Sequence, residues 1–168
     1  MKTLDWLNNN IISNGLLCDE YVEKVRNARS KKQLFEVCAD ANGVTFLAEM
    51  REQGNPLSYE TIWEDFERYI NGKYKPSFES ENRGSYTSAI YCQAHFTKDI
   101  FVDTTLTLFL SCINEVYIQP YHVARIVVDQ ESAIKVHCPK TSKVFIEVYG
   151  DGEVEVAEGI DRTNIKRK

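Results

Sequence analysis

Apolar and polar residues alternate from Thr104 to Glu158, and the alternation recurs every ten residues. In each block of ten, the fourth, sixth and eighth positions are mostly apolar, as at Val144, Ile146 and Val148. A period of two indicates a strand with one buried face. Recurrence at ten indicates that equivalent strands follow one another through short turns. The segment is therefore predicted to be a stack of short strands with one apolar row inside.

Two architectures fit a strand every ten residues. In a flattened β-solenoid, about twenty residues complete a coil, so each strand pairs with the strand two blocks away. In an antiparallel meander or sandwich, consecutive strands pair through hairpins. The segments Asp129-Gln130-Glu131-Ser132 and Lys140-Thr141-Ser142 contain little hairpin turn chemistry, and the apolar rows stack in order. These observations favour the solenoid and leave the meander as the alternative.

The first 72 residues have helical periodicity and are predicted to form about five short helices. Ser30 with Gln33 three residues later predicts a capping box, and Ser58 predicts a second helix start. Asn-Gly pairs punctuate the segment, and each is predicted to be a C-terminal cap because Asn and Gly tolerate the left-handed conformation. These pairs are Asn14-Gly15, Asn42-Gly43 and Asn71-Gly72.

The predicted fold class is α+β, with the helices preceding the strands. Helical periodicity stops at Lys73, where Lys, Pro, Ser, Asn and Gly dominate. We divide the chain into a helical segment (1–72), a connector loop (73–88), a repetitive β segment (89–160) and a basic tail (161–168). The final acidic strand, Glu153 to Glu158, is expected to discourage further strand pairing at its edge.

Composition limits the class of protein. The 168 residues carry a net charge of -5, which argues against a general binder of the nucleic-acid backbone. No run of residues approaches the length that spans a bilayer, so no membrane partner is expected. The five cysteines include no closely spaced pair, which fits a reducing, cytoplasmic setting with cysteines used as small apolar residues.

Catalytic and metal-binding residues are sparse. An activated thiol needs a basic partner, which three histidines could supply, and His95 is the preferred partner for Cys92 or Cys112. Both cysteines also suit the protein core, and that interpretation is preferred. His122 and the adjacent pair His137-Cys138 add further metal-ligand types, but side chains adjacent in a strand point to opposite faces. Neither a metal site nor a cofactor is expected.

Candidate partner-binding residues fall in two groups. Basic and aromatic residues interleave in the connector, a mixture that suits a protein or nucleic-acid contact. The outward side of the β rows, which includes Val127, is too apolar for a wet surface, so the helices or another chain must cover it. The candidates are Tyr74, Lys75, Arg83 and Tyr86 in the connector, and Phe109, Tyr117, Phe145 and Tyr149 in the β rows.

These observations predict a non-catalytic interaction or structural protein that self-associates through the outward β face. The general texture, an acidic helical part before a repetitive β part, is similar to accessory proteins of phages and mobile elements, and it assigns no role to any residue. One alternative is a small hydrolase or transferase that depends on Cys and His. Another is an acidic inhibitor that presents helix carboxylates to a basic nucleic-acid-binding partner.

Overall fold

Helices and strands occupy two consecutive parts of the chain, as the sequence predicts. The structure is a computed structural model, and it describes residues 1–80, 84–95, 99–157 and 164–168. In these residues the helices are α1 (Lys2–Trp6), the π-helix η1 (Leu7–Ile12), α2 (Asp19–Asn27), α3 (Lys31–Ala39), α4 (Ala41–Glu52) and α5 (Tyr59–Phe66). The strands are β1 (Ser77–Ser80), β2 (Gly84–Cys92), β3 (Ile100–Val102), β4 (Leu106–Leu110), β5 (Ile113–Ile118), β6 (Val123–Val128), β7 (Ala133–His137), β8 (Lys143–Val148), β9 (Glu153–Val156) and β10 (Ile165–Arg167).

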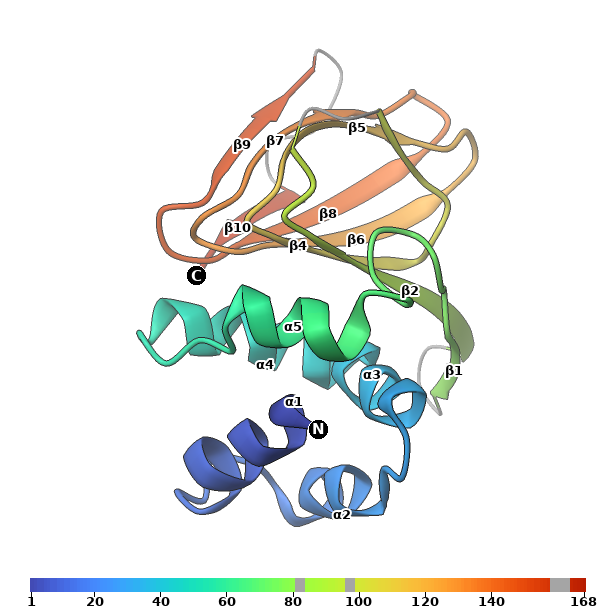
Figure 1. Ribbon diagram of the computed structural model, residues 1–168. Coiled ribbons are helices and arrows are strands. Elements are labelled where there is room, and N and C mark those ends of the chain that lie inside the picture. The colour runs from blue at the N-terminus through green and yellow to red at the C-terminus, as the bar shows by residue number, and fades with distance from the viewer. Residues whose placement is uncertain (81–83, 96–98, 158–163) are drawn as a thin grey trace.

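The strands form a flattened β-solenoid, which confirms the predicted fold class. Successive strands from β2 to β9 alternate between two sheets, and each pairs in parallel with the strand two steps away. The six-stranded sheet has the order β1-β2-β4-β6-β8-β10, and the four-stranded sheet has the order β3-β5-β7-β9. Parallel pairing between strands that are not consecutive excludes the meander, in which consecutive strands pair antiparallel. Figure 1 shows the coils stacked side by side.

The inner row of the solenoid is apolar and closed to solvent. It contains Ala124, Ile126 and Val128 of β6 and the matching residues Val144, Ile146 and Val148 of β8. Val123 pairs with Lys143, so the coil repeats after the twenty residues that the sequence predicts. In these coils the regular pairing therefore places the fourth, sixth and eighth residues of each block inside the solenoid.

The inner row differs from the prediction in β4. Leu106 pairs with Arg125, which makes this coil one residue shorter than the later ones. A one-residue shift turns every side chain of a strand to the other face. Leu106 and Leu108 consequently face the helices, whereas Phe109, predicted to point outward, lies inside the solenoid.

The helices pack on the outward face of the six-stranded sheet (Figure 1). Their shared core contains the outward residues of β2 and β4, together with Val127 and Tyr149. Helices α4 and α3 supply contacts to β4, β6 and β2. The helices therefore explain why many outward positions of the strands are apolar: these side chains are buried against the helices.

Polar caps set the helix boundaries, with one correction to the predicted caps. Ser30 and Ser58 accept hydrogen bonds from the backbone N–H groups of Gln33 and Thr61, as their spacing predicts. The Asn42-Gly43 pair, predicted to end a helix, lies in the first turn of α4. Asp40 starts that helix by accepting hydrogen bonds from both N–H groups of the pair.

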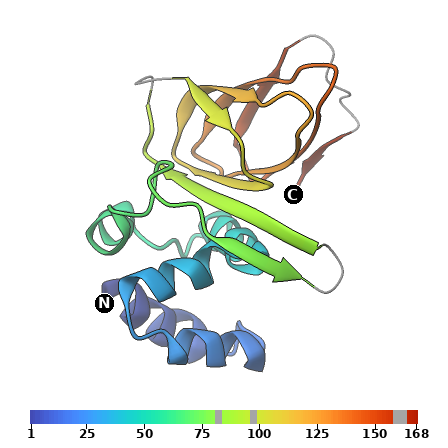
Figure 2. The ribbon, with the colours of Figure 1, turned by 90° about the vertical axis from the view of Figure 1, so that its right-hand side faces the viewer.

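Two segments predicted to lack regular structure contain strands. Within 73–88, β1 and the first half of β2 pair antiparallel through Phe78 and Tyr86. Figure 2 shows this hairpin between the solenoid coils and the helices. Within the predicted basic tail, β10 pairs in parallel with β8. Ile165 packs against the solenoid interior, which explains why a short basic segment is held as a strand.

Candidate interaction surface

The outward side of the four-stranded sheet, which we call the outer sheet face, lies away from the helices (Figure 1). Alternate residues of its strands point outward and form rows across the sheet. The first row has Ile113, Ala133 and Glu153, the second Glu115, Lys135 and Glu155, and the third Phe101, Tyr117 and His137. The face therefore changes along the strands from a mostly apolar row, through a charged row, to an aromatic row.

The third row is a ladder of stacked rings. The ring centroids of Phe101 and Tyr117 are 5.4 Å apart, and those of Tyr117 and His137 are 4.4 Å apart with an angle of 6° between the planes. Phe101 stands at the edge of the sheet and is 58% exposed. Stacking of rings on paired strands stabilises the sheet and fixes the rotamers of these side chains.

Glu115 ties the ladder to the charged row. The Tyr117 hydroxyl donates a hydrogen bond to Oε2 of Glu115 at 3.0 Å, and Nε2 of His137 lies 2.8 Å from the same oxygen. The hydrogen bond from His137 lowers the pKa of Glu115 below its usual value. Glu115 is therefore an ionised carboxylate at neutral pH that orients both rings.

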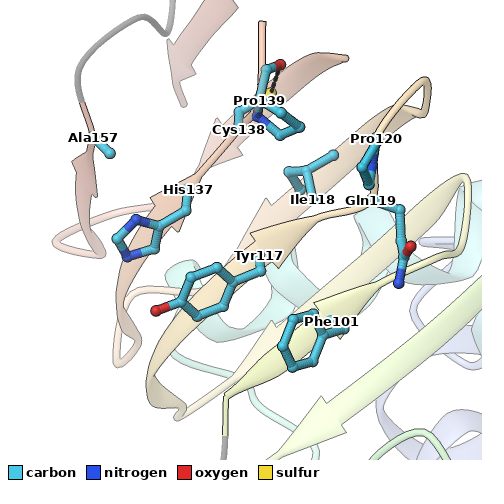
Figure 3. Close-up of a pocket in the computed structure, with 9 residues that line it drawn as sticks. All are labelled: Phe101, Tyr117, Ile118, Gln119, Pro120, His137, Cys138, Pro139 and Ala157. Atoms are coloured by element: carbon cyan, nitrogen blue, oxygen red, sulfur yellow. Dashed lines mark hydrogen bonds between the residues drawn. The ribbon is translucent and has the colours of Figure 1, made fainter. Parts of the chain in front are cut away.

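A shallow cavity of about 540 Å³ lies where the third row meets the loops after β5 and β7. Its lining combines the three rings with the small and apolar residues Pro120, Pro139 and Ala157. Figure 3 shows His137 between Tyr117 on one side and Ala157 on the other. The volume suits one large side chain or a small ligand group.

A second exposed surface lies on the six-stranded sheet, where the helices do not reach. Val123 of β6 and Phe145 of β8 point outward on neighbouring strands and are 56% and 40% exposed. The ammonium of Lys143 lies 4.9 Å from the centre of the Phe145 ring. Beside them, Nε of Arg125 pairs with Oε1 of Glu147 at 3.0 Å. We call Val123, Lys143 and Phe145 the solenoid patch.

The structure separates the four candidate residues of the β rows. Tyr117 belongs to the outer sheet face and Phe145 to the solenoid patch. Phe109 and Tyr149 are buried, the first inside the solenoid and the second against the helices, so both are corrections to the predicted partner surface. Phe109 differs because its coil is one residue shorter, and Tyr149 differs because it follows the end of β8, where the helices cover the sheet.

The connector candidates make contacts within the protein. The Tyr74 hydroxyl hydrogen bonds to Glu36, and its ring packs against Phe35 and Tyr69. Lys75 pairs with Asp103 at 2.7 Å. Tyr86 stacks on Phe78 and accepts a hydrogen bond from the N–H of Ala41. Arg83 lies outside the described residues.

The cysteine candidates lack the features of a nucleophile. Cys92 and Cys112 are buried, and burial raises the pKa of the Cys92 thiol and raises that of Cys112 to about 12. The hydrogen-bond partner of His95 through Nε2 is the carbonyl oxygen of Ser111, at 2.7 Å. A reactive cysteine needs a lowered pKa and access to solvent, so this geometry argues against a Cys- and His-dependent hydrolase or transferase.

We expect Cys92 and Cys112 to resist alkylation in the folded protein, because their thiols are buried and protonated at neutral pH. Cys18 is exposed and is therefore expected to react faster than either of them. Iodoacetamide labelling followed by peptide mass spectrometry measures each site. Faster labelling of Cys92 or Cys112 than of Cys18 at pH 7 would contradict this interpretation. That result would favour the hypothesis of a Cys- and His-dependent hydrolase or transferase.

Among the described residues, no group of three or more His, Cys, Asp or Glu side chains is arranged to hold a metal ion. The helices of the described ranges are all too short or too polar to cross a membrane. Comparisons with protein-family models, with curated proteins and with solved structures gave no match. The exposed surfaces of the protein are therefore the features from which its function is inferred.

Sequence reasoning missed Phe101 and the role of Glu115. Tyr117 and His137 are twenty residues apart and both fall on outward positions, which is a signal for the ladder. Phe101 pairs with Tyr117 over only sixteen residues, so the ten-residue pattern does not reveal it. Glu115 precedes Tyr117 by two positions and shares its face, as a strand requires.

Proposed function

We propose that the protein is a non-catalytic interaction or structural protein that associates with a second copy of itself through the solenoid patch. The proposal rests on the positions of the large apolar side chains that remain exposed. Of five such residues in the described ranges, four belong to the solenoid: Phe101, Tyr121, Val123 and Phe145. Val123 and Phe145 lie on neighbouring strands of one sheet, and adjacent exposed apolar side chains are typical of binding surfaces.

The charges around the solenoid patch are suited to contact with an identical copy. Lys143 supplies a cation at one end of the patch, and Glu147, which also pairs with Arg125 of its own chain, supplies a carboxylate two positions beyond Phe145. A two-fold axis brings the same patch of two copies together. Lys143 of one copy would then lie near Glu147 of the other, while the Phe145 rings bury each other.

The contacts of the helix carboxylates disfavour the alternative that the protein is an acidic inhibitor. Several of the helix carboxylates already have cationic partners in the same chain. Lys24 pairs with Glu20 at 2.9 Å, and Lys2 pairs with Glu64 at 2.6 Å. Asp65 is buried, pairs with Lys31 and accepts a hydrogen bond from the N–H of Thr3. A role as a phage or mobile-element accessory protein remains part of the proposal.

We expect Phe145→Asp to lower the mass of the assembly measured by size exclusion with light scattering, because it places a charge in the contact. Leu16→Asp is the matched control, since Leu16 is 49% exposed in the helical part of the chain. Its assembly mass should equal that of the unmodified protein. A monomeric unmodified protein, or equal masses for all three, would overturn the proposal of self-association.

A further inference from the structure

The aromatic ladder of the outer sheet face ends one strand before the sheet does. Phe101, Tyr117 and His137 occupy the rows of β3, β5 and β7. The N–H of Ala157 donates a hydrogen bond to the carbonyl oxygen of Val136, so Ala157 continues β9 into the same row. Its methyl group is too small to stack, and Tyr117 is the one ring of the described residues that stacks on His137 (Figure 3). We call this position the open rung.

The surroundings of the open rung suit a long side chain with a planar end. The cavity there is lined by Ala157, Pro139 and Cys138 as well as by the His137 ring. Apolar lining accepts a methylene stem, and a ring face accepts a flat group stacked against it. Because Tyr117 and Glu115 hold the imidazole in place, the stacking surface exists before any ligand arrives.

The charge of the outer sheet face selects a cation. Its carboxylates are Asp99, Glu115, Glu153 and Glu155, against the single lysine Lys135 among the described residues of the rows. Glu155 lies in β9 two positions before Ala157 and is exposed, and its cationic partner among the described residues is Lys135, at 3.2 Å. Such a field repels phosphates and attracts basic groups. A nucleotide base would fit the shape of the open rung but not its charge.

We propose that the outer sheet face binds an arginine side chain of a basic protein partner, with the guanidinium stacked on His137 at the open rung and its charge facing Glu155. Arginine combines the two required properties, a planar cation that stacks on rings and pairs with carboxylates, whereas the lysine ammonium is a point charge. This inference rests on the proposed role of the protein as an interaction protein. It concerns the outer sheet face, whereas the proposed self-association uses the solenoid patch.

The test uses fluorescence anisotropy with two labelled peptides of equal length, one with four arginines and one with four lysines in a Gly-Ser background. We expect the unmodified protein to bind the arginine peptide about two- to fivefold more tightly, the range for a stacked cation at an exposed site. Both affinities should fall as salt is raised.

Ala157→Ile fills the open rung with a branched side chain that offers no ring face, and it is expected to remove the preference for arginine. Glu155→Gln removes the facing charge, and we expect it to weaken binding of the arginine peptide about two- to fivefold. Glu153→Gln is the matched control, because it removes an equal charge from the row farthest from the ladder. Circular dichroism with thermal unfolding verifies that each variant is folded.

Equal binding of the two peptides, or a preference that survives Ala157→Ile, would overturn the proposal, as would absence of binding to either peptide. Tighter binding of adenosine monophosphate than of the arginine peptide would also overturn it. The self-association test uses Phe145 on the other sheet, so each proposal can fail while the other stands.

Discussion

Asp129→Ala is expected to lower the free energy of unfolding by about 3–5 kcal/mol, because it removes the buried carboxylate that pairs with the buried Arg51 and leaves the half-exposed Glu131 in contact with the guanidinium. The Asp129 carboxylate is 2.8 Å from Nε of Arg51, and neither side chain is more than 5% exposed. Oδ1 of Asp129 also accepts hydrogen bonds from the Ser132 hydroxyl and from the N–H of Ser111. The pair joins helix α4 to the turn after β6, and its loss affects both parts of the chain.

Glu131→Ala provides the matched control for that change. Glu131 contacts the same guanidinium at 3.1 Å, but its side chain is 47% exposed. Pairs that reach solvent contribute about 0–1 kcal/mol, so this variant should lose little. Urea unfolding followed by circular dichroism measures both. If both variants lose the same free energy of unfolding, the larger effect expected for Asp129→Ala does not arise from burial of its pair with Arg51.

The double variant Arg51→Met with Asp129→Leu separates the two components of the effect. Replacing both charges by apolar groups of similar size removes the unpaired cation, and such replacements are commonly neutral or stabilising. We therefore expect the double variant to be more stable than Asp129→Ala. A double variant as unstable as the single one would indicate that the hydrogen bonds of Asp129 to Ser111 and Ser132 dominate.

The sequence gives no signal for this ion pair. Asp129 and Glu131 lie in a turn between strands, where acidic residues are common, and Arg51 lies near the end of a helix. Their contact spans about eighty residues and depends on how the helices lie on the sheet. Local pattern cannot supply that arrangement, because the helices could cover either face of a solenoid that is apolar inside.

The solenoid itself follows from local pattern. Alternation and the repeat at ten specify strands, and pairing two blocks away follows from parallel stacking of equivalent rows. The early coils depart from the repeat, since Ser88 pairs with Leu106 over eighteen residues and Leu106 with Arg125 over nineteen. In these shorter coils the backbone angle φ is positive at Gln93 and at Ser111. Neither residue is a glycine, so the sequence does not indicate these turns.

The candidate surfaces were predictable only in part. Outward positions of β5 to β8 were correct, and Tyr117 and Phe145 lie where the sequence places them. Tyr149 has the same alternation as Phe145 but is covered by the helices. The difference between a buried and an open outward residue therefore depends on the length of the helical layer, which the ten-residue pattern does not contain.

Phe109→Ala and Phe145→Ala form a matched pair that tests the assignment of faces, because the repeat predicts both rings to point outward. Phe109 lies inside the solenoid with no exposed surface, and its ring centroid is 5.4 Å from that of Tyr91. Truncation of a buried Phe leaves a cavity and costs about 3–5 kcal/mol. Truncation of the exposed Phe145 should change stability by about 0.5 kcal/mol at most.

Urea unfolding of both variants, at a concentration low enough to dissociate assemblies, measures the difference directly. Phe109→Leu is the fallback if Phe109→Ala does not fold, and we expect it to lose less because it keeps part of the buried volume. Equal losses at positions 109 and 145 would mean that the coil containing β4 has the twenty-residue register of the later coils. The leucines of β4 would then face inward, and the helices would have lost the apolar surface on which they pack.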